Sequence, residues 1–503
     1  MISSKVLIPL VVGVACLLAV LAGTNLAVDA NQTMVFSGLI AMIGVLLLFA
    51  REFWWLGLFV AVGFGGYLYF GFKIYSHECL LALALGGLLP SIAINPTSEF
   101  GRGRPLLPWF FYATLIYLGL EIPYSVAIND PHGMIEIGNI VRAYTFGIWP
   151  LVFVFFFRLY GRTSYLPFAL YLLQSIYIFR ALLTIGTIYF PKATMVLPAI
   201  NFVLPGNDAN GGGLDDLRFS GHGMCLLACA ILLGHPKPSV RFWQCIVFAF
   251  SLLCLLMGGG RGLTVASMLV IIAAIAAARM WKALTAATFA VICLIVFLNL
   301  FPRSLDVVDY RVQRTLSVLI WNGDSSETKM RVAGSDVWHD RLREIGFERW
   351  ITSPRTFVFG TGIRPWNASA VRETNWALKF EALLQGAADT GGYESALWTI
   401  LAPAGLAGLL LCVCTIGYFA LYNGRRLLSG QLSGMERTVA FLGVYAPIEW
   451  ALFSPVQGGY PAIELLYAAT AFYYLHDHCL SGSSQISNHQ AEDDSPYAET
   501  ARS

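Results

Sequence analysis

The sequence predicts an all-α polytopic membrane protein with about fourteen transmembrane helices and one large polar loop late in the chain. Of its residues, 57% are hydrophobic and 12% are charged, against about 25% charged in a soluble domain. The mean hydropathy is +0.66. So few charges cannot cover a water-exposed surface, and lipid must therefore cover much of the chain.

The predicted spans are apolar runs close to the roughly 20 residues that a membrane-crossing helix needs. In chain order they occupy 6–23, 33–50, 54–72, 78–95, 106–122, 142–158, 165–189, 221–235, 240–258, 263–280, 283–301, 395–422, 435–453 and 459–477. The first run resembles a secretory signal peptide, with a faint cleavage-like site at Ala30. Since further spans follow, we interpret it as an uncleaved first helix.

The distribution of basic residues predicts which connections face the cytoplasm. With the N-terminus inside, the outer connections before the large loop collect only about five Lys and Arg residues. The inner side collects Lys5, Arg51, Arg102, Arg104, Arg158, Arg162, Lys237, Arg241, Arg279, Lys282, Arg425, Arg426 and Arg437. This bias places both termini inside and the long connections 123–141, 190–220 and 302–394 outside.

These assignments divide the chain into four parts. Residues 1–301 hold the first eleven predicted spans, and residues 302–394 form the large outer loop. Residues 395–480 hold the last three predicted spans. From Ser481 the chain is polar and lacks hydrophobic periodicity, which predicts a disordered cytoplasmic tail over 481–503.

The outer loop is rich in Arg, Trp, Asp and Glu. Within it, 336–351 predicts an amphipathic helix, because Trp338, Leu342 and Ile345 fall on one helical face. A helix that covers the membrane mouth, with its charges in water, accounts for this stretch without a catalytic role.

Composition also argues against several classes of protein. The ten cysteines lie mostly in apolar runs without disulfide or metal-ligand spacing, so we expect them to pack between helices and predict no metal site. The net charge is +2, and the charges are scattered between apolar runs, which does not favour a nucleic-acid partner.

Arginines at membrane depth are the candidate functional residues, because a charge there costs about 2.5–3.5 kcal/mol and usually faces a polar cavity or a partner. Arg218 lies in GNDANGGGLDDLRFSGHG, where a glycine-rich loop precedes a predicted helix. Backbone N–H groups and the guanidinium could bind an anion there. The alternative is a surface pair between Arg218 and Asp215 or Asp216.

Arg261 lies in LLMGGGRGLT, at the outer end of two predicted spans. Glycine lets the backbone approach a ligand closely, and a guanidinium matches phosphate with two parallel hydrogen bonds. The lysine and the serine or threonine of a nucleotide-binding loop are missing. The alternative is a tight hairpin whose arginine reaches the interface.

Two further candidates complete the set. Arg180 lies well inside the run 165–189 and is predicted to face a polar cavity; the alternative is a pair with Glu78, Glu121 or a helix carbonyl. Arg142, at the outer surface, is a weaker candidate. Glu394 stands where the chain returns to the membrane and is predicted either to cap that helix or to act as a general base or acid.

Several of these motifs occur in a recognisable order. They are Arg218-Phe219-Ser220-Gly221 before a helix, Gly260-Arg261-Gly262 at a hairpin, Ser353-Pro354 with Phe359-Gly360-Thr361-Gly362 late in the large loop, and Glu394 before Gly405-Leu406-Ala407-Gly408. In this order they resemble the O-antigen ligase and polymerase superfamily of bacterial membrane glycosyltransferases. The resemblance covers roughly the second half of the chain.

The resemblance implies a metal-independent glycosyltransferase without a cofactor, in the bacterial inner (cytoplasmic) membrane, with its active site on the periplasmic side. The donor would be a glycan on undecaprenyl diphosphate, and the acceptor a glycan or a lipid. Arg218 and Arg261 would bind the diphosphate, with Arg180 as a supporting charge and Glu394 as the base. Arginines can stabilise a departing diphosphate without a metal.

Three functions follow as expectations. Ligases of this superfamily typically place a histidine where this chain has Glu394-Ser395, which favours a polymerase that joins lipid-linked repeat units. The first alternative is a ligase that moves a finished glycan to a lipid or protein. The second is a transporter of lipid-linked glycan, although transporters more often have repeated halves, and no internal repeat is visible.

Overall fold

Helices dominate the computed structural model of this chain. It describes residues 55–56, 58–59, 67–69, 73–75, 81, 85, 103–129, 134–189, 212–301, 310–316, 327–364, 376–393, 395–453 and 460–493. The predicted spans 6–23 and 33–50 lie outside these residues, as does nearly all of 78–95.

The elements are, in chain order, β1 (Tyr67–Tyr69), β2 (Lys73–Tyr75), α5 (Trp109–Asn129), α6 (Met134–Tyr160), η1 (Thr163–Tyr165), α7 (Leu166–Tyr189), α10 (Gly212–Leu233), α11 (Pro238–Gly258), α12 (Arg261–Ala277), α13 (Trp281–Leu300), α14 (Tyr310–Leu316), α15 (Glu327–Ile351), α16 (Pro354–Phe359), α17 (Trp376–Asp389), α18 (Ala396–Leu428), α19 (Gly434–Phe453) and α20 (Ala462–Asp493). Strands β1 and β2 form an antiparallel hairpin, with Leu68 opposite Ile74. The predicted helix 54–72 is therefore wrong over Tyr67–Tyr69, where aromatic residues favour extended chain.

Six of the described helices are long and apolar enough to cross a membrane, namely α5, α6, α7, α11, α13 and α18. Helices α10 and α12 contain shorter apolar stretches, Leu217–Leu233 and Arg261–Ala277. The chain therefore has the apolar helices that the sequence predicts for a membrane protein. The total of about fourteen spans and the side of the membrane that each connection faces stay predictions.

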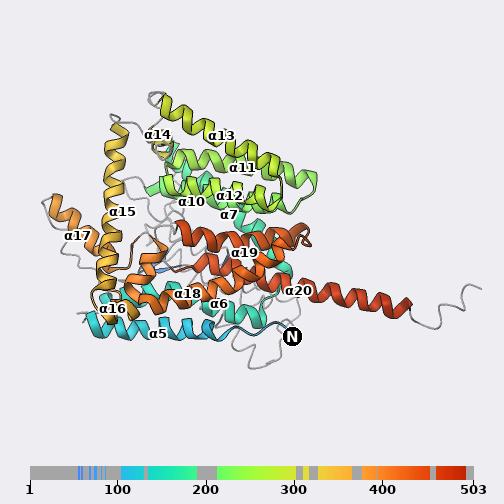
Figure 1. Cartoon of the computed structure of the whole chain (residues 1–503), viewed down its shortest axis with the longest axis horizontal. Helices are drawn as coiled ribbons and strands as arrows, with labels where there is room; N and C mark the ends of the chain where they lie inside the picture. Colours follow the sequence, from blue (N-terminus) through green and yellow to red (C-terminus); the bar gives the residue numbers. More distant parts are fainter. Residues whose placement is uncertain are drawn as a thin grey trace, which may run out of the picture.

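Helix α10 is the centre of one half of the bundle, where it contacts α7, α11, α12 and α19. In the other half, α18, α19 and α20 pack on one another, and α5 and α6 close against α18 and α20 respectively. Helix α19 joins the halves, because it contacts both α10 and α20 (Figure 1). The core between these helices is aromatic and aliphatic, with Phe153, Phe419 and Tyr473 fully buried.

The described parts of the large polar segment form helices that lie at one end of the bundle. Helix α15 crosses the ends of the bundle helices, with α16 and α17 at the same end (Figure 1). It contacts α14, α16, α17 and α18, while α14 contacts α11 and α12. The predicted helix 336–351 is confirmed within α15, and its predicted apolar face is buried: Leu342 and Ile345 are covered, with Trp338 packed against the same cluster.

Helix α18 is interrupted at Gly405, whose φ of 63° and ψ of −172° are not helical. The loop after α16 lies along this break. The Thr361 N–H donates to the carbonyl of Ala402, and the Gly362 N–H to the carbonyl of Pro403, each at 2.9 Å. The loop thus satisfies carbonyls that an interrupted helix leaves without intrahelical partners.

Glycines make this approach possible. A Cβ on Gly360 would collide with the Pro403 carbonyl, and one on Gly405 with the Val358 carbonyl. Both glycines also have positive φ. The Phe-Gly-x-Gly element and the first glycine of the Gly-x-x-Gly element therefore meet in one backbone contact, which gives both elements a structural role.

The opposite end of the bundle is tied together by arginines that the charge bias assigns to the inner side. Arg104 binds both carboxylate oxygens of Asp477, at 3.0 and 2.6 Å, and donates to the carbonyl of Gly161 at 2.8 Å. Arg279 donates to the carbonyl of Leu428 at 3.4 Å. These contacts join the chain before α5 to α6 and α20, and the end of α12 to the end of α18.

Helix α20 continues through Asp493 and projects from the bundle (Figure 1). The described part of the polar tail, 481–493, is therefore helical and not disordered as predicted. A helix that has already nucleated on a packed segment adds residues at little cost, even where their composition is polar.

Candidate functional site

Arg218 lies inside α10, six residues after its first residue, Gly212. The prediction of a loop at Arg218 with a helix starting after it is wrong. Asp215 and Asp216 suit the first turns of a helix, whose dipole favours negative charge there, and Leu217 is already fully buried. The helix consequently begins earlier than the glycine-rich composition indicates.

Arg218 packs against the hairpin that carries Arg261. Gly258 is the last residue of α11, and Gly260 is the N-cap residue of α12. A Cβ on Gly258 would lie 2.7 Å from the Arg218 Cβ, and one on Gly260 would lie 2.5 Å from the Arg218 Cδ. The hairpin glycines therefore allow close approach of Arg218, and the residue next to this contact is Arg261.

Arg261 is the first residue of α12 and is partly buried. The positive end of a helix dipole and the N–H groups of a first turn favour an anion. Arg218, in the second turn of α10, thus packs against the residue before Arg261, which starts α12. The structure brings close to each other two arginines that the sequence predicted separately.

Arg180 lies on α7 and is also partly buried. One turn earlier, the Tyr177 ring packs against α10, where a Cβ on Gly223 would lie 2.6 Å from the ring. Tyr177 interacts electrostatically with Arg180, Glu449 and Glu464. Tyr177 is therefore the residue that links the surroundings of Arg180 to acidic groups on α19 and α20, and a cavity at Arg180 stays a prediction.

His222 forms a buried ion pair that the sequence analysis missed. It lies one turn after Arg218 on α10, and its Nε2 is 2.6 Å from Glu449 Oε1 on α19. Its Nδ1 is 2.9 Å from Ser267 Oγ on α12. His222 and Glu449 are each 8% exposed. The principle that singled out the arginines, an ionisable residue inside an apolar run, applies equally to Glu449 in the run 435–453.

A wider polar cluster surrounds this pair. Glu464, at the start of α20, interacts electrostatically with Glu449 and accepts hydrogen bonds from the backbone N–H of Ile463 and from its own. The Tyr445 hydroxyl donates to the Ala266 carbonyl at 2.8 Å. Helices α7, α10, α12, α19 and α20 therefore all contribute polar groups to the region around His222 and Glu449, one turn along α10 from Arg218.

Glu394, the predicted base, lies outside the described residues. Helix α18 begins at Ala396, and its N-cap residue Ser395 makes no side-chain capping hydrogen bond. The capping role and the role of general base or acid for Glu394 both stay predictions.

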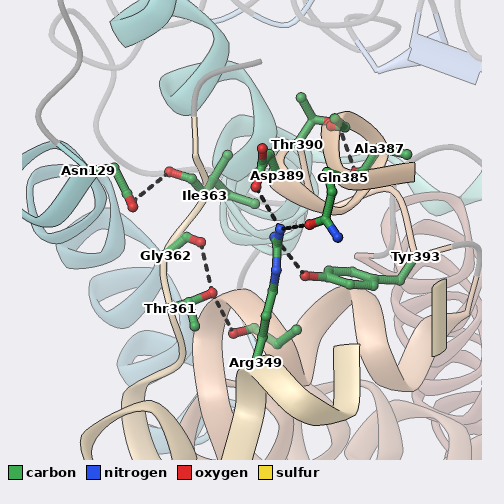
Figure 2. A network of polar contacts seen from close by, with 12 residues as sticks. Asn129, Arg349, Thr361, Gly362, Ile363, Gln385, Ala387, Asp389, Thr390 and Tyr393 are labelled. Carbon is green, nitrogen blue, oxygen red and sulfur yellow. Dashed lines mark hydrogen bonds and ion pairs between the residues drawn. The ribbon is translucent and has the colours of Figure 1, made fainter. Parts of the chain in front are cut away.

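The described residues just before α18 form a polar network around Arg349 of α15. Arg349 donates to Asp389 Oδ1 at 2.8 Å, to Gln385 Oε1 at 2.9 Å and to the Tyr393 hydroxyl at 3.4 Å (Figure 2). Burial raises the pKa of the Tyr393 phenol, and the nearby Arg349 charge opposes that rise. The network ties α15 to α17 and to the entry of α18.

The same region is anchored to α5. Asn129 donates to the Ile363 carbonyl at 3.1 Å (Figure 2), and the Ile363 N–H donates to Ser125 Oγ at 3.0 Å. The loop that carries Gly360 and Gly362 is therefore held from two sides, by α5 and by the break in α18. Such anchoring fixes the described loop 360–364 at this end of the bundle.

Within the described part of the chain, no group of three or more His, Cys, Asp or Glu side chains could hold a metal ion. In comparisons with known proteins, no family model matches the chain and no curated protein matches it.

Proposed function

We propose that this chain is a membrane glycosyltransferase that polymerises undecaprenyl-diphosphate-linked glycan repeat units into a surface polysaccharide. The observation that carries the proposal is the packing of Arg218 against the Gly258–Gly260 hairpin, next to Arg261. Two guanidinium groups beside the start of α12 suit the two phosphates of a diphosphate, because each can make paired hydrogen bonds to phosphate oxygens.

The chemistry is a displacement at the anomeric carbon of the donor glycan. The bond from this carbon to the diphosphate oxygen breaks, and a bond to an acceptor hydroxyl oxygen forms. Arg218 and Arg261 stabilise the negative charge that develops on the departing diphosphate, with Arg180 as a further positive charge. The acceptor proton passes to a carboxylate, for which Glu394 is the candidate.

The helices of the polar segment support this proposal. Helix α14 contacts both helices of the arginine hairpin, and α15 bridges α14 to α18. A helical cover at this end of the bundle would limit the access of water, which strengthens electrostatic interactions inside a site. In the proposed orientation this end faces the periplasm of a bacterial inner membrane.

The test is synthesis by purified protein from a lipid-diphosphate glycan, with the product length measured on a gel. Arg218→Ala and Arg261→Ala are each expected to lower chain growth by about 100-fold, the typical effect of removing one charge-stabilising group. Glu394→Gln is expected to abolish growth while the protein still inserts in the membrane.

A glycine pair supplies the matched control. Gly260→Ala puts a Cβ 2.5 Å from Arg218 Cδ, whereas at Gly262 nothing lies within 4 Å of the added carbon. Gly260→Ala is expected to displace the Arg218 side chain and reduce synthesis, and Gly262→Ala to leave it unchanged. Wild-type product from both arginine variants would overturn the proposal. Transfer of a finished glycan without growth would identify a ligase, and movement between leaflets without a new glycosidic bond a transporter.

A further inference from the structure

His222 ties together the helices that carry the two diphosphate-binding arginines. It lies four residues after Arg218 on α10, which is about 6 Å along the helix axis. Its partner Ser267 lies six residues after Arg261 on α12, about 9 Å along that axis. The hydrogen bond between His222 Nδ1 and Ser267 Oγ, at 2.9 Å, therefore joins the two helices within two turns of the arginines.

The surroundings of His222 allow both of its ring nitrogens to donate. The Ser267 hydroxyl can donate its only hydrogen to the Leu263 carbonyl at 2.8 Å, and its oxygen then accepts from Nδ1. The carboxylate of Glu449 can only accept, so Nε2 donates to it at 2.6 Å. This arrangement corresponds to an imidazolium beside a carboxylate.

A buried ion pair such as His222 with Glu449 is not needed to stabilise the packing of these helices. Well-packed apolar residues of similar volume often give equal or greater stability, because two charges must be taken out of water. Around His222 the same helix does pack with apolar side chains, including Leu217, Met224 and Ala228. Unlike apolar packing, the hydrogen bonds of His222 to Ser267 and Glu449 are directional, and they fix the orientation of α10 against α12 and α19.

The orientation of α10 matters because Arg218 packs tightly against Gly258 and Gly260. The Arg218 backbone and Cβ lie against Gly258, and its Cδ lies against Gly260, at distances that leave no room for a single added carbon. A small slide or rotation of α10 against the α11–α12 hairpin would push Arg218 into that backbone or draw it away. The His222 contacts resist that movement.

We propose that His222, held by Glu449 and Ser267, is a positioning residue that sets Arg218 relative to Arg261 and so determines the affinity of the site for a diphosphate. This inference rests on the proposed function. It assigns His222 no contact with substrate, and its effect passes through Arg218.

The experiment measures binding of farnesyl diphosphate to the full chain in detergent by calorimetry. His222→Ala is expected to weaken binding about tenfold, the size of coupling seen between residues of one network. In the Arg218→Ala background, His222→Ala is expected to change binding no further. Additive losses would show that His222 acts independently of Arg218 and would overturn the proposal.

Conservative variants separate positioning from general stability. The His222→Asn amide can replace the Nδ1 donor to Ser267, whereas the His222→Gln amide reaches the Nε2 position and Glu449. Asn is expected to retain more affinity than Gln or Ala, because the link to α12 controls the arginine pair. Equal affinity of all three variants would overturn the proposal.

The matched control is another buried polar pair, Gln174 with Gln244, whose amides exchange hydrogen bonds of 2.7 and 2.9 Å between α7 and α11. Gln174→Ala is expected to lower the unfolding temperature as His222→Ala does, with unchanged diphosphate affinity. If Gln174→Ala weakens binding equally, the effect of His222 is general destabilisation and the proposal fails.

Failure of the proposed function looks different. If wild-type protein binds no farnesyl diphosphate, or if Arg218→Ala and Arg261→Ala bind it normally, the diphosphate site itself is wrong. If both arginine variants lose binding and His222→Ala binds like the wild type, only the positioning role is wrong. Amide hydrogen exchange over 258–264, expected to rise in His222→Ala, tests the helix register without any ligand.

Discussion

At the scale of single residues, buried charge in this protein is held by several partners at once. Arg104 is 6% exposed and binds Asp477 through two nitrogens, while its remaining donors reach backbone carbonyls at the end of α6. Asp477 in turn accepts from Thr163 Oγ1 at 2.7 Å. Because each buried polar group has a partner, the network avoids the desolvation cost of an isolated charge.

Arg104→Ala is expected to lower the free energy of unfolding by about 3–5 kcal/mol, the cost of breaking a buried ion pair. Asp477 loses its charged partner, and several carbonyls lose a donor. Arg104→Lys is expected to cost less, because it keeps the charge but lacks the planar fork. Denaturant unfolding in detergent measures both. Arg343→Ala, which removes a pair whose two side chains are exposed, is expected to change stability by less than about 0.5 kcal/mol.

At the scale of elements, the sequence predicted the bounds of α7, α11, α12, α13 and α19 closely. It missed the bounds of others, including α10, where local composition misleads. Helix α7 matches the prediction 165–189, because a long apolar run between polar ends leaves few alternatives. The start of α10 was missed, because Gly212, Gly213 and the aspartates that follow are typical of a loop. The break in α18 depends on a loop some 40 residues earlier in the chain, and no local pattern contains that contact.

For the candidate site, the sequence identified single residues but not the contacts between them. Arg218 and Arg261 stand out individually in the sequence, because each is a charge at the edge of a predicted span with glycines nearby. Their contact through Gly258 and Gly260 is a feature of packing. The pairing of His222 with Glu449 joins residues from distant helices, and only the tertiary structure identifies the partner of either.

The break in α18 gives a test at this scale. Gly405→Ala is expected to lower the unfolding free energy by about 3 kcal/mol, because the added Cβ meets the Val358 carbonyl and the backbone has positive φ. Gly417→Ala in the same helix meets nothing within 4 Å and is expected to be neutral or to stabilise by up to about 1 kcal/mol. Equal unfolding temperatures of the two variants would contradict the proposed fit of loop and break.

At the scale of the whole molecule, the two ends of the bundle differ in chemistry. One end carries the arginine hairpin, the break in α18 and the helices α14 to α17. The other end carries Arg104, Arg279 and the projecting part of α20. Outside the large polar segment 302–394, the connections between apolar helices carry most of their basic residues at the second end, including Arg158, Arg162, Lys237, Arg241, Arg425 and Arg426. Such an excess in short connections is typical of the cytoplasmic side of membrane proteins.

Cysteine labelling decides which end faces outward. Asp340 on α15, with 75% of its side chain exposed, reports on the first end, and the exposed Ser429 after α18 reports on the second. In a variant without its ten native cysteines, we expect a membrane-impermeant maleimide to label Asp340→Cys in intact cells. Ser429→Cys should react only after permeabilisation, because its neighbours Arg425 and Arg426 favour the cytoplasm. The opposite result would place Arg218 and Arg261 at the cytoplasmic surface, where an outward-facing lipid-linked donor could not reach them.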